Sequence, residues 1–164
     1  MHYLLKVSGI AIALVFAAFA PNALAQENTN TYTCRDIGVA APEPLGDREG
    51  HTITIDQQSC HVDSGPMSGG ILTGRTIWEW NGPNAVLVSG NGVIRKPGAT
   101  VVYVQTDGKL ALTMTDGKVT GWTASGKGAW AIATGSAASL AGKSATWTGK
   151  PAGPGEFTVE DKLE

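Results

Sequence analysis

Residues 91–142 read NGVIRKPGATVVYVQTDGKLALTMTDGKVTGWTASGKGAWAIATGSAASLAG, and this stretch decides the fold. Short runs with high β-propensity alternate in it with signals for tight turns, which are Asn91-Gly92, Pro97-Gly98, Asp107-Gly108, Asp116-Gly117, Gly126, Gly135 and Gly142. Turn signals at such short intervals predict an antiparallel meander, in which each strand folds back on the one before it. A long meander either closes into a barrel or leaves an unpaired edge strand, and closure is the common solution.

The rest of the chain extends this pattern into an all-β domain. We expect strands at 52–56, 71–80, 85–90, 93–96, 99–106, 109–115, 118–124, 127–134, 140–148 and 155–160. The polar residues 26–33 predict a leader, and the glycine- and proline-rich residues 35–50 predict a long loop. Residues 137–140 are expected to form at most one helical turn. The sequence therefore predicts a single antiparallel meander that closes into a barrel of about eight strands.

Residues 1–25 have the composition of a secretory signal peptide. Lys6 precedes an apolar run at 7–20, and Ala23-Leu24-Ala25 is a small-x-small cleavage site. A transmembrane anchor is the alternative, but the run is too short, because a spanning helix needs about 20 apolar residues. We therefore expect cleavage, one β-barrel domain at 26–164, a periplasmic or secreted location and no membrane span in the mature protein.

The chain is weakly acidic, with 12 Lys and Arg against 14 Asp and Glu. A nucleic-acid partner is not expected, because phosphate binding needs a basic footprint. The sequence contains no motif of a phosphate loop, a dinucleotide site, a nucleophilic serine or a zinc protease. We predict no cofactor, and nothing in the sequence specifies a number of subunits.

Cys34 and Cys60 are the two cysteines of the chain. An even number of cysteines in an exported protein predicts a disulfide. This bridge would close a loop of about 27 residues, which is worth on the order of 3–4 kcal/mol in the chain-entropy picture. A redox or metal-binding pair is the alternative, but no Cys-x-x-Cys motif and no third thiol accompany them.

Five tryptophans are many for a chain of this size, and each falls in an expected strand; they are Trp78, Trp80, Trp122, Trp130 and Trp147. Such side chains line pockets for apolar or aromatic ligands, and they also fill cores. For a single tryptophan the core role is favoured, whereas the set favours a ligand site. Trp78 and Trp80 lie on one face of one strand and are the strongest pair.

Glu79 and Tyr103 are the candidates for a catalytic residue that donates or accepts a proton. In the strand of Trp78 and Trp80, Glu79 lies with Arg75 on the opposite face. If the tryptophans faced outward, this pair would be buried, and Glu79 could bind or protonate a substrate. If the tryptophans face the interior, the pair is solvated, which is the favoured arrangement.

His51, Asp56, His61 and Asp63 lie close together in sequence, near Cys60. Histidines with carboxylates can bind a divalent metal or form a base with its orienting group. Their spacing matches no metal signature, so we interpret them as a solvated set and predict no metal site.

The last third of the chain resembles the closing strands of the allene oxide cyclase and dirigent barrels. The resemblance rests on glycine spacing in Gly126-Lys127-Gly128-Ala129-Trp130, in 134–142, in Thr148-Gly149 and in Gly155-Glu156-Phe157-Thr158. It implies an eight-stranded antiparallel barrel with an apolar cavity. None of the catalytic or ligand residues of those families matches a position here, and the region of Cys34 and Cys60 departs from their pattern.

We therefore expect an exported small β-barrel protein that binds a small apolar or aromatic molecule. A cofactor-independent cyclase or isomerase of the allene oxide cyclase type is one alternative, with Glu79 or Tyr103 handling a proton. A module that binds or inhibits another exported protein through its surface is the other.

Overall fold

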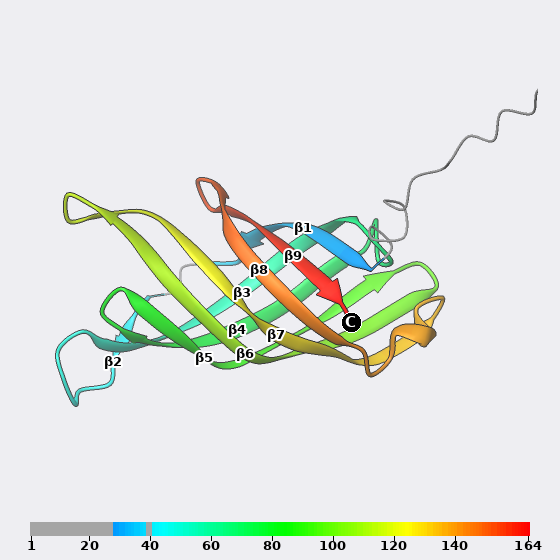
Figure 1. Cartoon of the computed structure of the whole chain (residues 1–164), viewed down its shortest axis with the longest axis horizontal. Helices are drawn as coiled ribbons and strands as arrows, with labels where there is room; N and C mark the ends of the chain where they lie inside the picture. Colours follow the sequence, from blue (N-terminus) through cyan, green and yellow to red (C-terminus); the bar gives the residue numbers. More distant parts are fainter. Residues whose placement is uncertain (1–27, 39–40) are drawn as a thin grey trace, which may run out of the picture.

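The computed structural model describes residues 28–38 and 41–164, so the expected signal peptide lies outside the described residues. These residues form an all-β protein (Figure 1). Its elements are β1 (Thr29–Asp36), β2 (Glu43–Pro44), β3 (His51–Ser64), β4 (Ile71–Asn81), β5 (Asn84–Lys96), β6 (Ala99–Thr115), β7 (Lys118–Gly135), the 3-10 helix η1 (Ala138–Leu140), β8 (Ser144–Gly153) and β9 (Glu156–Leu163). Within the described residues, no helix is long and apolar enough to cross a membrane.

The predicted antiparallel barrel is confirmed. From β3 to β9 each strand pairs with the next, and β1 closes the barrel by pairing with β9 on one side and with β3 on the other. Eight strands therefore form the wall, and the short β2 adds to β3 outside it. Closure leaves no long unpaired edge, which is the physical reason for preferring a barrel to an open meander.

The meander has fewer and longer strands than the sequence predicted. Asn91-Gly92 lies within β5, and Asp107-Gly108 and Gly126 lie within the β6–β7 pair, so the turns predicted at these three places are wrong. Asp116-Gly117 is a turn as predicted, with φ of 51° and 74° at its two residues. Gly92 lies against Leu72 and the backbone of β4, and Gly108 and Gly126 lie against the ring of Trp147, so close packing is the physical reason for glycine at these in-strand positions.

The beginning of the chain also departs from the prediction. Residues 29–36 form β1, a strand of the wall, where the sequence predicted a polar leader followed by a loop. The strand predicted at 52–56 is part of the longer β3, and the one predicted at 140–148 begins later, at Ser144. The single helical turn predicted at 137–140 is present as η1.

One end of the barrel is filled and the other is open. The first end holds the 65–70 loop, η1 and the turn that follows β5. Buried side chains fill this end, including Met67, Val101, Trp130 and Leu163. At the opposite end lie residues 37–38 and 41–50 and the hairpin turns after β4, β6 and β8. The second core cluster, around Trp78 and Trp147, lies in this half and surrounds a cavity.

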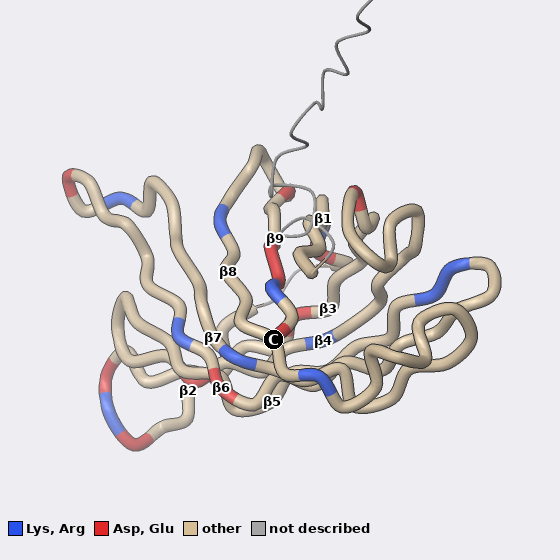
Figure 2. Tube along the Cα trace, turned by 45° about the vertical axis from the view of Figure 1, so that its right-hand side comes forward, with Lys and Arg blue, Asp and Glu red and all other residues tan. Residues whose placement is uncertain are grey.

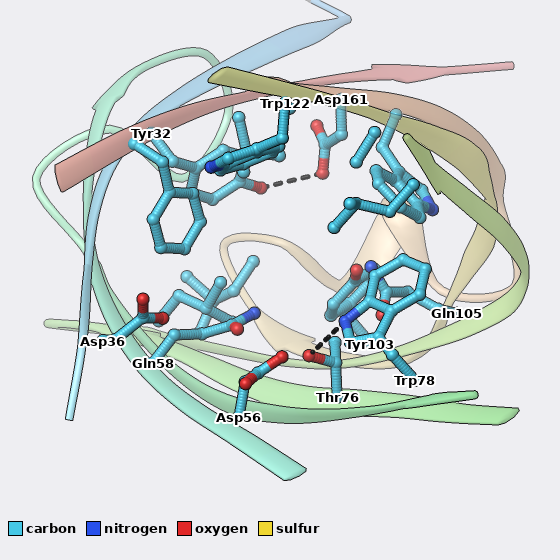
Figure 3. A pocket seen from close by; sticks show the side chains of 18 of the residues that line it. Tyr32, Asp36, Asp56, Gln58, Thr76, Trp78, Tyr103, Gln105, Trp122 and Asp161 are labelled. Carbon is cyan, nitrogen blue, oxygen red and sulfur yellow. Dashed lines mark hydrogen bonds between the residues drawn. The ribbon is translucent and has the colours of Figure 1, made fainter. Parts of the chain in front are cut away.

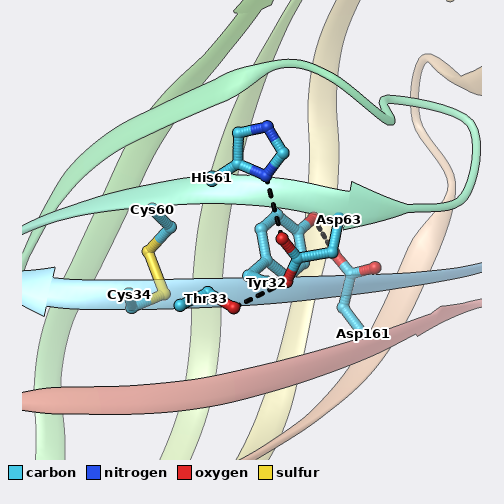
Figure 4. Close-up of a disulfide and its surroundings, with 7 residues drawn as sticks. All are labelled: Tyr32, Thr33, Cys34, Cys60, His61, Asp63 and Asp161. Carbon is cyan, nitrogen blue, oxygen red and sulfur yellow. Dashed lines mark hydrogen bonds and ion pairs between the residues drawn. A yellow bond between two sulfur atoms is a disulfide. The ribbon is translucent and has the colours of Figure 1, made fainter.

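The predicted disulfide joins Cys34 on β1 to Cys60 on β3 (Figure 4). The two residues are direct cross-strand partners, and both side chains are buried. The bridge therefore fastens the β1–β3 seam, where the first wall strand meets the rest of the meander.

Charged positions of both signs are distributed over the strands and loops (Figure 2). Lys and Arg positions and Asp and Glu positions are both spread along the trace. Neither sign of charge is therefore confined to one segment of the described chain.

Candidate ligand cavity

The open half of the barrel contains a cavity of about 220 Å³ (Figure 3). Its walls come from β1 and β3 to β9, because every wall strand sends inward-facing side chains into it. Four of the five tryptophans line it, namely Trp78, Trp80, Trp122 and Trp147. The tryptophans of β4 thus face inward with Thr76, as the favoured interpretation of the alternation required.

The tryptophan rings are fixed by packing and by hydrogen bonds. Trp78 and Trp147 meet edge to face, with ring centroids 6.4 Å apart. Trp78 Nε1 donates to Thr76 Oγ1 at 3.0 Å, and Trp80 Nε1 donates to Thr54 Oγ1 at 3.0 Å. Because these indole N–H groups are already satisfied, the rings offer apolar faces and edges to the cavity.

Trp130 has a different role from the other four. It does not line the cavity, and its side chain is completely buried in the filled half of the barrel. Its Nε1 donates to Asp161 Oδ2 at 3.3 Å. The core role that the sequence favours for a single tryptophan therefore applies to Trp130.

Inward-facing glycines make room for the aromatic rings. A Cβ on Gly126 would lie 2.6 Å from Trp147 Cζ2, and one on Gly108 would lie 3.0 Å from the same atom. A Cβ on Gly128 would lie 3.3 Å from Tyr103 Cε2. These glycines are therefore needed inside the strands, because a larger residue would push the rings into the cavity.

A buried polar cluster lies on the side of the cavity that faces the filled half. Asp161 is 4% exposed and accepts hydrogen bonds from Asn30 Nδ2 at 2.7 Å and from the Tyr32 hydroxyl at 2.8 Å, in addition to the bond from Trp130. Burial raises the pKa of Asp161, and these hydrogen bonds offset the rise only in part. Burial and the nearby Asp161 raise the pKa of Tyr103, the predicted catalytic candidate that lines the cavity.

A second acidic group lies on the β1 and β3 side of the cavity, where Asp36 and Asp56 point inward with Gln58 between them (Figure 3). Asp36 pairs across strands with Gln58, and Asp56 pairs with Thr76. Burial and the neighbouring Asp36 raise the pKa of Asp56 to about 6, although the Thr76 hydroxyl opposes the rise. Burial also raises the pKa of Asp36.

Glu79, the other catalytic candidate, lies outside the barrel. It does not line the cavity, and its Oε1 lies 2.8 Å from His51 Nε2. Arg75 is also exposed on the outer face. A catalytic role for Glu79 stays a prediction, but Glu79 has no access to a ligand in the cavity.

The four residues that cluster in sequence near Cys60 are separated by the fold. His51 is buried between Asp47 and Glu79 and does not line the cavity, while Asp56 points into it. His61 contacts Asp63 at 2.8 Å on the outer face of β3 (Figure 4). Across residues 28–38 and 41–164, no group of three or more His, Cys, Asp or Glu side chains is arranged to bind a metal.

Sequence reasoning missed Asp36, Gln58 and Asp161 as cavity residues. The available signal was the strict alternation of side chains within β3 and β9. Asp56 and Gln58 share a face of β3 with Cys60, and Asp161 shares a face of β9 with Val159. Polar residues at inward positions weaken the apolar alternation by which strands are found.

Comparison with known proteins adds no assignment: no protein-family model matches this chain, and no curated protein matches it.

Proposed function

We propose that the protein binds a small apolar or aromatic molecule in the open half of its barrel. The observation that carries the proposal is the cavity lined by Trp78, Trp80, Trp122 and Trp147. Trp78 and Trp147 are buried against each other, whereas Trp80 and Trp122 are only partly buried, so the four rings surround an open space instead of filling it. Ligand sites are typically concave and mostly apolar, with a few fixed polar groups, and this cavity has that composition.

The volume of the cavity limits the size of the ligand. At about 220 Å³ it is smaller than the cavities of roughly 300–1,000 Å³ that hold drug-sized molecules. One aromatic ring or two fused rings with a short substituent suit this space better than a long acyl chain.

A fluorescence titration tests the proposal. A naphthalene-based probe should quench tryptophan emission of the folded protein and should bind more weakly to Trp80→Ala. The matched control is Val88→Ala, because Val88 is exposed on the outside of β5. We expect at least tenfold weaker binding for Trp80→Ala, which corresponds to about 1.4 kcal/mol, and no change for Val88→Ala. If no apolar probe binds, the surface-binding module becomes the better hypothesis.

An enzyme of the cyclase or isomerase class is the second candidate. It is supported by the resemblance to allene oxide cyclase barrels and by two ionisable groups that line the cavity with raised pKa values, the partly buried Tyr103 and the buried Asp161. In such an enzyme the walls would fold a reactive substrate while the Tyr103 hydroxyl exchanges a proton. Tyr103→Phe would then abolish turnover and leave binding of an unreactive analogue unchanged. Equal loss of turnover and binding would argue against this role.

We also propose that the protein is exported. The composition of residues 1–25 and the Cys34–Cys60 disulfide support this location. N-terminal sequencing of the protein recovered outside the cytoplasm should give Gln26 as the first residue. A mature protein that still begins with Met1 would contradict the proposal.

A further inference from the structure

The cavity is acidic as well as aromatic. Twenty residues line it, and they include the carboxyl groups of Asp36, Asp56 and Asp161 but no Lys, Arg or His. The other titratable groups that face it are the hydroxyls of Tyr32 and Tyr103, neither of which carries positive charge. The cavity therefore contains negative charge without a protein cation to balance it.

The carboxylates differ in their partners. Asp161 accepts hydrogen bonds from Asn30, Tyr32 and Trp130, so the fold itself satisfies it. Asp36 and Asp56 take part in none of the salt bridges found among the described residues. Their neighbours across the strands are the neutral side chains of Gln58 and Thr76.

Two neighbouring carboxylates without a cation are costly in a partly dry site. Like charges disfavour ionisation of both groups, and removal from water adds to this cost. Burial raises the pKa of Asp36, and burial together with the nearby Asp36 raises the pKa of Asp56. A positively charged group on a ligand would remove the repulsion and would gain charge-assisted hydrogen bonds.

The aromatic rings favour an organic cation. An ammonium group close to a tryptophan face gains cation–π attraction, and the remaining cavity surface suits an apolar body. Trp78 donates its indole N–H to Thr76, the cross-strand partner of Asp56, so this ring lies beside the acidic group. We propose that the ligand is a small aromatic amine in its ammonium form, held by Asp36 and Asp56 with its ring among the tryptophans. This inference rests on the proposed function.

A bare metal ion fits these groups less well. Calcium takes six to eight oxygen ligands and magnesium about six in octahedral geometry. Asp36 and Asp56 supply only two carboxylates, with the Gln58 amide and the Thr76 hydroxyl nearby, and the remaining wall is largely apolar. The environment therefore suits a cation that carries its own apolar surface.

Calorimetric titration at pH 8 with three matched probes tests this inference. The probes are 2-(naphthalen-2-yl)ethylamine, which is cationic, the corresponding alcohol, which is neutral, and 2-naphthylacetate, which is anionic. We expect the amine to bind at least tenfold more tightly than the alcohol, because a hydrogen bond to a charged group is worth about 1.5–3 kcal/mol. The anion should bind most weakly of the three.

Three variants locate the cation. Asp56→Asn and Asp36→Asn should each weaken amine binding about tenfold and leave alcohol binding nearly unchanged. Glu160→Gln is the matched control, because Glu160 is an exposed carboxylate on β9 that does not line this cavity. It should change neither affinity. The thermal melt of each variant, compared with that of the parent, establishes that the variants are folded.

The outcomes separate the inference from the proposed function. Alcohol binding as tight as amine binding would overturn the ammonium assignment while leaving the apolar-ligand proposal standing. An amine preference that survives in both Asp variants would also overturn it, because the cation would then bind elsewhere. Calcium chloride that binds the protein and displaces the amine would favour a metal instead. Failure of all three probes to bind would overturn both proposals.

Discussion

The hydroxyl of Tyr32 donates a hydrogen bond to Asp161 Oδ2 at 2.8 Å, across the seam where β1 pairs with β9. The first and last strands of the barrel are thus joined by a buried side-chain bond as well as by their backbones. Asp161 also accepts from Asn30 on β1, so two of its three side-chain donors come from the first strand.

Tyr32→Phe should destabilise the fold by about 1–3 kcal/mol, because it leaves a buried carboxyl group with one donor fewer. Urea denaturation at pH 7 measures the change. Tyr103→Phe is the control, since Tyr103 is a second, partly buried tyrosine of the cavity and makes no direct hydrogen bond to Asp161. Equal losses in the two variants would show that the Tyr32 bond adds nothing to barrel closure.

Removal of the disulfide should cost about 3–4 kcal/mol in the chain-entropy picture, since 26 positions separate Cys34 from Cys60. The Cys34→Ala, Cys60→Ala double variant is compared with the parent by urea denaturation without reductant. The intact mass of the parent should be about 2 Da below that of the reduced protein, as expected for the loss of two hydrogens when the disulfide forms. Two free thiols in the purified protein would contradict the prediction.

Glycines inside and outside the strands should respond differently to alanine. Gly126→Ala places a Cβ against the backbone oxygen of Asp107 and the ring of Trp147, and should cost about 2–3 kcal/mol and shift tryptophan emission. Gly117→Ala has open space around its Cβ, so only its φ of 74° opposes the change, at about 1 kcal/mol. A larger loss for Gly117→Ala in urea would contradict the packing role of Gly126.

Asp56 should lower stability at neutral pH. Its pKa rises from 3.8 to about 6 on folding, so the folded state binds the proton more tightly than the unfolded state. The stability due to this group is therefore greatest below pH 3.8 and falls as pH rises toward 6. Asp56→Asn should be more stable than the parent at pH 7.5, by on the order of 1 kcal/mol after allowance for partial solvent contact, and nearly equal to it at pH 4.

Asp63→Asn provides the comparison of opposite sign. The hydrogen bond to His61 lowers the pKa of Asp63, so Asp63 stabilises the fold above its ordinary value of 3.8. This variant should be less stable than the parent at pH 7.5. If Asp56→Asn and Asp63→Asn were both more stable than the parent at pH 7.5, the cause would be a general relief of negative charge instead of an effect of the cavity.

His51 should titrate above its ordinary pKa of 6.5, because Asp47 and then Glu79 hydrogen-bond to its ring. The stability that it contributes is therefore complete below pH 6.5 and is lost as pH rises through the folded-state pKa. NMR titration of the ring protons should give a lower midpoint in Asp47→Asn, and a smaller decrease in Glu79→Gln. An unchanged midpoint in Asp47→Asn would show that the contact is absent in solution.

The sequence was sufficient to predict the parts of the fold that follow local rules. Asp116-Gly117 forms a turn because glycine adopts positive φ there, and Trp78 and Trp80 share the inner face because side chains alternate along a strand. Asp107-Gly108 carries the same turn signal but lies inside β6, where the missing Cβ makes room for Trp147. Local sequence does not distinguish these two uses of glycine, since the second depends on a ring from β8.

The strand that closes the barrel was missed for a related reason. β1 reads TNTYTCRD and has few apolar residues, because its inward positions include Asn30 and Asp36. Asn30 is satisfied in the interior because it donates a hydrogen bond to Asp161, more than a hundred positions away, and accepts one from the Met67 amide. The acidic part of the candidate site is hidden in the same way, since Asp36 and Asp56 are polar residues in places where a pattern search expects apolar ones.

The filled end of the barrel makes the molecule easy to orient on a support. The Leu163 amide donates to the Asn28 carbonyl at 2.8 Å, so the two ends of the described chain meet beside η1, away from the cavity. A tether attached after Glu164 would therefore project from the filled end. Molecules immobilised this way would present their openings to the solution in a uniform direction, so a surface-based biosensor would measure ligand exchange without obstruction by the tether.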